Sequence, residues 1–217
     1  MTPETPTRHR RMAIGRSLFV GALFALLLGS PAGADDAALY GPKAPPGSAF
    51  VRIFNADRQP LGESIVGTQT IPALAALAAS DYVYLPAGRR AIKVGGQRVE
   101  RELSADTYYT AVHTGDGVRV HELTPPDNRL KALIVLYNHA GDRSLSLRTA
   151  DGETTIAEAG PGEAATREVN PVKVPMAVFA DDRELETVRG VTLERGRAFN
   201  LFVAGPADDP QTRWVID

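Results

Sequence analysis

The candidate for nucleophilic chemistry in this sequence is Ser144, which follows the turn-forming run Gly141-Asp142-Arg143. Acyl transfer needs such a nucleophile beside a histidine and a carboxylate. No Asp-x-x-His block follows Ser144, and the sequence contains no Gly-x-Ser-x-Gly elbow, phosphate loop or dinucleotide fingerprint. We therefore interpret residues 141–145 as a hairpin turn and expect no catalytic residue there.

The histidines do not form a metal-binding pattern. His9 lies in the first residues of the chain, and the other three are His113, His121 and His139. Zinc sites usually place ligands at short spacings such as His-x-x-x-His, with cysteine or carboxylate nearby. These three histidines are spaced by 8 and 18 residues, and the chain has no cysteine. We expect no metal and no cofactor, although a site assembled in three dimensions stays open.

A cluster of cations is the strongest candidate for binding. Gly95-Gly96 predicts a tight hairpin, and alternate residues on its two strands share one face of the sheet. Several cations could therefore form a stripe on an otherwise acidic protein. They are Arg89, Arg90, Lys93, Arg98 and Arg101, accompanied by Glu100 and Glu102. Two interpretations stay open, namely a contact for an acidic partner or a polyuronate, and a solvated hairpin face.

An internal repeat indicates the elements that position these residues. Val51–Asn55 resembles Ile134–Asn138 at an offset of 83, and Tyr109–Gly115 resembles Phe199–Gly205 at an offset of 90. The difference between the two offsets (90 − 83) predicts a longer loop in the second copy. Two copies of a small β unit are typical of a scaffold, so a binding or adaptor role comes ahead of catalysis.

Hydrophobic alternation and turn residues predict β-strands from residue 49 onward. Strands recur about every 8 to 12 residues between Gly, Pro, Asn and Asp turns, which is the pattern of a sandwich. Residues 133–137 form a continuous apolar run, as in a strand buried on both faces. Residues 71–79 form a loop or short crossover helix at most, and Trp214 is expected to fill the core. The fold class is therefore all-β, with two tandem small antiparallel β-sandwiches of immunoglobulin-like type.

The chain divides into five segments in this interpretation. Residues 124–128, Thr-Pro-Pro-Asp-Asn, stop a strand and stiffen a short linker. In the proline-rich arm, Leu39 and Tyr40 are the large apolar residues, and they either pack on the protein's own surface or dock a partner. The segments are a signal peptide (1–34), the arm (35–47), an N-terminal sandwich (48–123), a linker (124–131) and a C-terminal sandwich (132–217).

The first residues predict export. An arginine-rich start precedes the apolar run 18–28, which is shorter than the roughly 20 residues of a membrane-spanning helix. We expect export through the Sec route to the periplasm, cleavage after Ala34 and no membrane span afterwards. The leader carries four arginines and one glutamate, so its removal takes the formal charge from −2 to −5. An acidic chain has no general attraction for nucleic acid, and none is expected as a partner.

Several segments resemble the AlgF family of alginate O-acetylation proteins. They are Asp35–Pro42, Phe50-Val51-Arg52 with Asn55-Ala56, Asn170–Val174 and Leu193–Gly196. The resemblance spans essentially the whole chain after the leader, and Leu39–Pro42 and Asn170–Val174 are its most specific parts. It adds Asn170 and Lys173 to the candidate contacts for a partner or the polymer.

The resemblance implies a role in adding O-acetyl groups to mannuronate residues of alginate during export. In that family a membrane-bound O-acyltransferase supplies acetyl groups, and periplasmic SGNH-type acetyltransferases carry the Ser-His-Asp machinery. This chain is then expected to be a non-catalytic periplasmic adaptor that links those partners. Two alternatives stay open: a polyuronate-binding module that presents alginate, and a transient acetyl carrier that uses Ser144 or His139.

Overall fold

The computed structural model describes residues 44–124, 128–188 and 190–217. These residues form β-strands without a helix, and no stretch among them is helical, long and apolar enough to cross a membrane. The predicted all-β class with two tandem sandwiches is confirmed. Residues 72–79 carry isolated bridges, Leu61 with Leu74 and Phe54 with Ala79, rather than a helix. The leader, its cleavage site and the arm residues Leu39 and Tyr40 lie outside the described residues.

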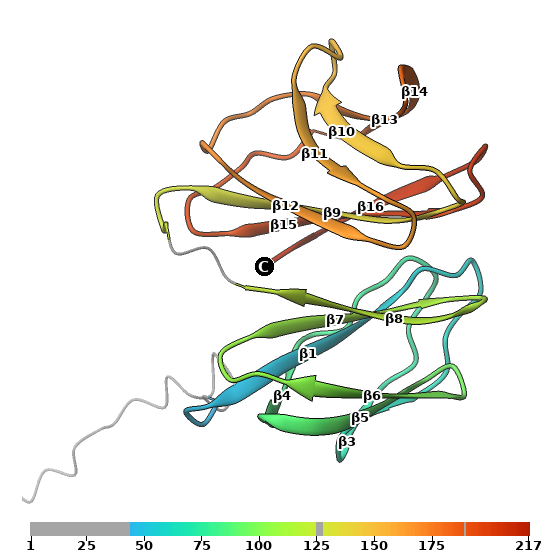
Figure 1. The fold of residues 1–217 in the computed structure, drawn as a ribbon, viewed down its shortest axis with the longest axis vertical. Coiled ribbons are helices and arrows are strands. Elements are labelled where there is room, and N and C mark those ends of the chain that lie inside the picture. The colour runs from blue at the N-terminus through green and yellow to red at the C-terminus, as the bar shows by residue number, and fades with distance from the viewer. Residues whose placement is uncertain (1–43, 125–127, 189) are drawn as a thin grey trace, which may run out of the picture. The chain divides into compact units, whose positions relative to one another are not determined.

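The first eight strands make the N-terminal sandwich, drawn from blue to green in Figure 1. One of its sheets has the order β4-β1-β7-β8, and the other has the order β3-β2-β5-β6. The strands are β1 Ser48–Asn55, β2 Ser64–Val66, β3 Gln69–Ile71, β4 Val83–Pro86, β5 Gly88–Val94, β6 Gln97–Leu103, β7 Tyr108–Thr114 and β8 Gly117–Leu123.

The last eight strands repeat this topology in the C-terminal sandwich. Its sheets have the orders β12-β9-β15-β16 and β11-β10-β13-β14, so each strand has a counterpart in the first sandwich. The strands are β9 Ala132–Ala140, β10 Leu145–Thr149, β11 Thr155–Ala159, β12 Ala164–Val169, β13 Met176–Ala180, β14 Arg183–Val188, β15 Ala198–Gly205 and β16 Gln211–Ile216.

The repeat seen in the sequence is preserved in the register of the strands. Val51 of β1 lies opposite Tyr109 of β7, and their repeat partners Ile134 and Phe199 lie opposite each other in β9 and β15. These two pairs run parallel, whereas the other strand pairs of the described residues are antiparallel. The antiparallel prediction therefore fails at one central pair of each sandwich. In the N-terminal sandwich the chain returns from the opposite sheet and β7 runs in the same direction as β1. In the C-terminal sandwich β15 runs in the same direction as β9.

Two loops of the second sandwich are longer than their counterparts. Residues 170–175 join β12 to β13, whereas Ala87 alone joins β4 to β5. Residues 190–197 lie between β14 and β15, where the first sandwich has only residues 104–107 between β6 and β7. The prediction of a longer loop in the second copy is confirmed.

A buried asparagine ends the repeated strand segment of each half. Asn55 and Asn138 are both 0% exposed. Nδ2 of Asn138 donates to the carbonyls of Arg143 at 2.7 Å and Ala159 at 3.0 Å, and its Oδ1 accepts from the amide of Ala140 at 3.2 Å. Asn55 bonds in the same way, to loop carbonyls and to the amide two residues on. The repeated asparagine therefore anchors the loops beside this strand end.

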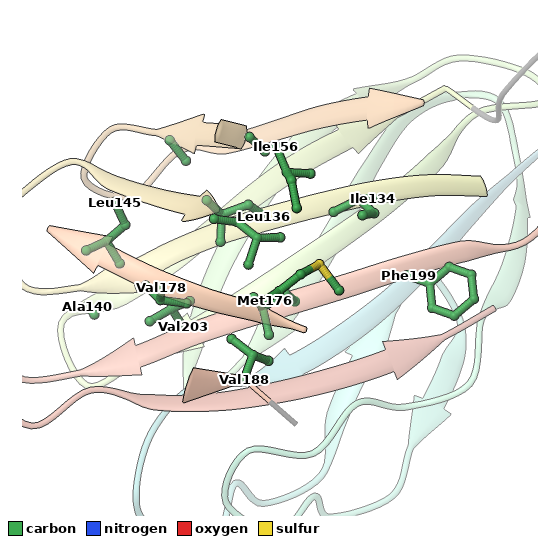
Figure 2. Close-up of a cluster of buried hydrophobic side chains, with 14 of the residues drawn as sticks. Ile134, Leu136, Ala140, Leu145, Ile156, Met176, Val178, Val188, Phe199 and Val203 are labelled. Atoms are coloured by element: carbon green, nitrogen blue, oxygen red, sulfur yellow. The ribbon is translucent and has the colours of Figure 1, made fainter. Parts of the chain in front are cut away.

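Each sandwich has its own apolar core. Figure 2 shows the C-terminal core, which contains Leu136 and Phe199 from one sheet and Leu145 and Val178 from the other. The corresponding N-terminal cluster is built from Val51, Ile53, Leu61, Val66, Ile92, Tyr109 and their neighbours. Trp214 was predicted to fill the core, and it instead packs half-buried against the C-terminal core.

A third apolar cluster joins the two sandwiches. Alternate residues of β9 face its own core, while Leu133, Val135 and Tyr137 belong to the joining cluster. In that cluster the Phe202 ring stacks on Phe54 at 3.7 Å and on Tyr137 at 4.3 Å between centroids. The predicted two-face burial of β9 is confirmed, and residues 44–217 form one compact unit.

A buried cation crosses the same junction. Arg52 is 1% exposed, and its guanidinium donates to both carboxylate oxygens of Asp217, at 2.8 and 3.1 Å. Its Nε donates to Oγ1 of Thr110 at 3.1 Å, and its Cζ lies 4.7 Å from the centroid of the Tyr82 ring. The Asp217 carboxylate also accepts from Nδ2 of Asn200 at 2.9 Å. Because an unpaired buried charge is costly, this pairing favours one arrangement of the two sandwiches.

Candidate functional site

The hairpin cations lie on two different faces of their sheet. Lys93 is paired with Arg98, and Arg90 is paired with Arg101, across β5 and β6. Because side chains alternate along a strand, Arg89, Lys93 and Arg98 share the outer face. Arg90 and Arg101 point to the other face, on the side of the core. The structure thus brings together three of the five predicted cations and separates them from the other two.

Much of the positive charge on the outer face is neutralised within the hairpin. Oε1 and Oε2 of Glu100 accept from Arg98 at 3.0 Å and from Arg89 at 2.8 Å, respectively. The hydrogen bonds from Arg98 and then Arg89 lower the pKa of the Glu100 carboxyl below its ordinary value. Lys93 is exposed, and within the described residues no carboxylate pairs with it. The net positive charge of this face is therefore small.

The two remaining hairpin cations, Arg90 and Arg101, also have partners within the protein. Arg90 donates to the backbone carbonyls of Pro86, at 3.0 Å, and Ala87, at 3.0 Å. Arg101 lies 3.9 Å from the carboxylate of Glu122 in β8. Arg90 thus stabilises the β4–β5 turn, which is a structural role.

The loop that contains Asn170 and Lys173 meets two other segments at one end of the C-terminal sandwich. Nζ of Lys131 donates to Oδ1 of Asn170 at 2.8 Å. Lys173 forms an isolated bridge with Thr192, and the amide of Gly196 donates to the carbonyl of Lys131 at 2.8 Å. The two residues predicted from the family resemblance are therefore exposed in a surface built by three segments.

Two histidines from different sandwiches meet at the junction. Nε2 of His121 in β8 and Nε2 of His139 in β9 are 3.0 Å apart, so the neutral pair needs one ring to donate and the other to accept. Burial, followed by the Arg119 charge, lowers the pKa of His121 to about 4. Burial, then His121 and Arg119, lowers the pKa of His139 to about 3. Both imidazoles are therefore neutral at pH 7.

The sequence spacing of these histidines hides their contact. They are separated by 18 residues and by the linker, and their meeting depends on how the two sandwiches pack. The described residues contain no group of three or more His, Cys, Asp or Glu side chains that could hold a metal ion. The pair acts instead as a hydrogen bond that connects β8 to β9.

A cleft of about 870 Å³ opens beside His139. It is lined by loops of both sandwiches, and its charges are mixed, since Arg58 and Arg119 stand against three aspartates. Arg58 is already paired with Asp209. The charged and titratable lining residues are Asp57, Arg58, Asp116, Arg119, His139 and Asp142. Mixed charge of this kind does not select an anionic polymer.

The geometry around Ser144 does not provide acyl-transfer chemistry. Ser144 is exposed in the turn between β9 and β10. Within the described part of the chain, neither a histidine nor a carboxylate makes a hydrogen bond with its hydroxyl. His139 is bonded to His121 instead. A nucleophile, a base and an acid are therefore not assembled at this turn.

Comparison with known proteins gives matches along the length of the chain. The family described as "Alginate O-acetyl transferase AlgF" matches residues 23–200. The "Alginate biosynthesis protein AlgF" of Pseudomonas fluorescens is 40% identical over 96% of this chain and 95% of its own length. The protein of that name from Pseudomonas aeruginosa is 40% identical over 99% and 97%. A solved structure of the C-terminal domain of AlgF from P. aeruginosa is 37% identical, covering 41% of this chain and 99% of its own, with a TM-score of 0.38.

Proposed function

Because this chain belongs to the AlgF family, we propose that it is a non-catalytic periplasmic adaptor required for the O-acetylation of alginate. In this role it links a membrane-bound O-acyltransferase to periplasmic SGNH-type acetyltransferases. The relatives are named alginate biosynthesis proteins, which supports the pathway. The family description names a transferase, so the choice between adaptor and enzyme depends on the residues of this chain.

The observation that carries the adaptor proposal is the buried junction between two sandwiches of the same topology. The stack of Phe54, Phe202 and Tyr137 and the ion pair of Arg52 with Asp217 hold residues 44–217 together as one unit. A protein that binds two partners at a fixed separation raises the effective concentration of each partner for the other. A junction that sets this separation suits an adaptor.

The chemistry of the described residues also favours an accessory role. The acetyl carrier alternative needs an accessible nucleophile with a base beside it. Ser144 is exposed but lacks such a base among the described residues, and His139 has a base beside it but uses that contact for its hydrogen bond. Intact-mass measurement after incubation with an acetyl donor checks this point. An acetyl adduct that disappears in Ser144→Ala or His139→Gln would favour the carrier.

The decisive experiment for the adaptor is an assembly measurement. The chain without its leader is mixed with the purified periplasmic parts of the membrane acyltransferase and of the SGNH-type acetyltransferases, singly and in pairs. Sedimentation velocity is expected to show a complex with each class of partner and a ternary complex with both. A folded chain that binds neither class, or two classes that displace each other, would overturn the proposal.

Titration with oligomannuronate separates the adaptor from the polymer-binding alternative. The hairpin cations, which motivated that alternative, are largely paired with Glu100 or with backbone carbonyls. We expect no saturable binding at 0.15 M salt. Binding that weakens with salt and with Lys93→Glu would support a polyuronate contact, because exposed charge pairs are screened.

A further inference from the structure

Two strongly exposed apolar side chains lie on adjacent segments at one end of the C-terminal sandwich. Leu130 is 67% exposed and Val172 is 49% exposed. The hydrogen bond from Lys131 to Asn170, at 2.8 Å, ties together the segments that carry them. A large apolar side chain held this far out of the fold gains nothing from its own core, whereas a partner could bury it.

Cations are the neighbours of these apolar residues along the chain and on a third, hydrogen-bonded segment. Arg129 and Lys131 flank Leu130, and Lys173 follows Val172. Arg195 lies on the third segment, which is bonded to Lys131 through the amide of Gly196 at 2.8 Å. Within the described residues no carboxylate pairs with any of these four cations, and the nearby Glu194 is taken by Arg197 at 3.3 Å. We name this surface the basic end, made of Arg129, Leu130, Lys131, Val172, Lys173 and Arg195.

Half of the basic end comes from two connections that are longer in the second sandwich than in the first. Val172 and Lys173 lie in residues 170–175, where the first sandwich has only Ala87. Arg195 lies in the stretch between β14 and β15, which is longer than the corresponding residues 104–107. The two halves share strands and register but differ here, so the extra residues add surface rather than fold.

We propose that the basic end docks an acidic segment of a partner protein whose apolar side chain covers Leu130 and Val172. The inference rests on the proposed adaptor function and names the surface and the chemistry of one partner. The four unpaired cations match carboxylates on that segment, because complementary charge steers and orients association. The exposed apolar pair favours a protein over a polyuronate, since a sugar polymer rich in carboxylates offers little to Leu130. Two apolar side chains are also too few to insert a surface into lipid.

The test compares two variants of the chain without its leader. Leu130→Asp with Val172→Asp removes the apolar contact, and Arg129→Glu with Lys173→Glu reverses half of the charge. The matched controls are Ile65→Asp, an exposed apolar residue of β2, and Arg183→Glu, an exposed cation of β14. Thermal melting verifies that all variants fold like the unaltered chain. Isothermal titration then measures binding to each purified SGNH-type acetyltransferase and to the periplasmic part of the acyltransferase.

Both basic-end variants are expected to weaken binding to one of these proteins by at least about tenfold, while the controls leave it unchanged. If the unaltered chain binds and both variants bind equally well, this inference is overturned and the adaptor proposal stands. If the unaltered chain binds none of the proteins, both fall together. A third outcome is that only the charge variant loses binding and that the unaltered chain also binds anionic vesicles or oligomannuronate. The partner would then be a polyanion and not a protein, and the inference would also be overturned.

Discussion

Asn138 shows what a single repeated residue contributes to this fold. Its amide is buried, and it satisfies two carbonyls and one backbone amide near the end of β9. Asn55 occupies the same place in β1. The repeated asparagine is therefore an anchor inside each sandwich.

Replacing this anchor should destabilise the protein strongly. Asn138→Ala leaves the carbonyls of Arg143 and Ala159 without their buried donor, so we expect a loss of about 3 kcal/mol in the free energy of unfolding. The exposed Asn170→Ala is the control and should change it by less than about 0.5 kcal/mol. Urea denaturation followed by fluorescence measures both. Equal effects of the two changes would contradict the anchoring role.

The neutral pair of His121 and His139 predicts a pH dependence of stability. Unfolded histidines titrate near pH 6.5, whereas the folded pKa values are about 4 and about 3. The unfolded chain therefore binds more protons in acid, so the contribution of the pair is complete above pH 6.5 and declines as the pH falls toward 3. For the two histidines together, we expect a loss of about 3 to 4 kcal/mol between pH 7 and pH 5.

The double variant His121→Gln with His139→Gln isolates this effect. Glutamine side chains can still form a hydrogen bond with each other but do not titrate. Denaturation at pH 7 and pH 5 should show a smaller loss in the variant than in the unaltered chain. The histidine assignment would be refuted by the same pH dependence in both proteins.

At the scale of the element, the β5–β6 hairpin depends on its two glycines in different ways. Gly95 has φ 55° and Gly96 has φ 77°, both in the left-handed region. A Cβ on Gly96 meets nothing, whereas a Cβ on Gly95 would overlap the His113 ring. The turn thus needs glycine at one position for backbone conformation and at the other for conformation and space.

Alanine substitutions should separate these two causes. Gly96→Ala is expected to cost about 1 kcal/mol for the left-handed conformation, and Gly95→Ala at least about 1 kcal/mol more because His113 must move. Chemical denaturation compares the two variants. An identical cost would show that His113 adapts without strain.

At the scale of the whole molecule, the ion pair of Arg52 with Asp217 holds the two sandwiches in one arrangement. Asp217→Asn leaves the buried guanidinium of Arg52 without a counter-charge. The new amide NH2 group would also face a donor of either Arg52 or Asn200, where the carboxylate accepts a hydrogen bond. We expect a loss of about 2 to 3 kcal/mol. Arg58 and Asp209 also bridge the two sandwiches, but their side chains are 47% and 70% exposed. Asp209→Asn should therefore change stability by less than about 0.5 kcal/mol.

Thermal unfolding of these two variants provides the measurement. The unaltered chain should unfold in one transition because the sandwiches share a buried cluster. Asp217→Asn should lower the midpoint and broaden or divide the transition, while Asp209→Asn should reproduce the original curve. A similar response in both variants would mean that the junction depends on its apolar stack alone.

The features that sequence could predict are those set by local pattern. The β5–β6 hairpin and the two-face burial of β9 follow from turn residues and apolar runs within a few residues of each other. The repeat in register follows from a comparison of short segments that recur along the chain. The parallel central pairs were missed, because strand direction depends on how the chain crosses between sheets.

The candidate sites were harder to predict because they depend on packing between distant segments. The contact of His121 with His139 requires the two sandwiches to pack against each other. In the hairpin, the carboxylate of Glu100 neutralises part of the positive charge by pairing with Arg89 and Arg98. The basic end needs three segments brought together by Lys131. A cation cluster in a sequence shows where charge is present, but only its neighbours determine how much remains unpaired.

The parallel pairing of β1 with β7 has a consequence for how the chain folds as it is made. Arg52 lies opposite Thr110, 58 residues later, so the centre of the sheet is closed by a contact of high sequence separation. Such contact order slows folding, because a long loop must be ordered before the pairing stabilises it. The β5–β6 hairpin can form early, while the apolar β1, and later β9, stays uncovered until its parallel neighbour has emerged. Each half is therefore prone to aggregation during synthesis until its seventh strand, β7 or β15, has been made and can pair with the first.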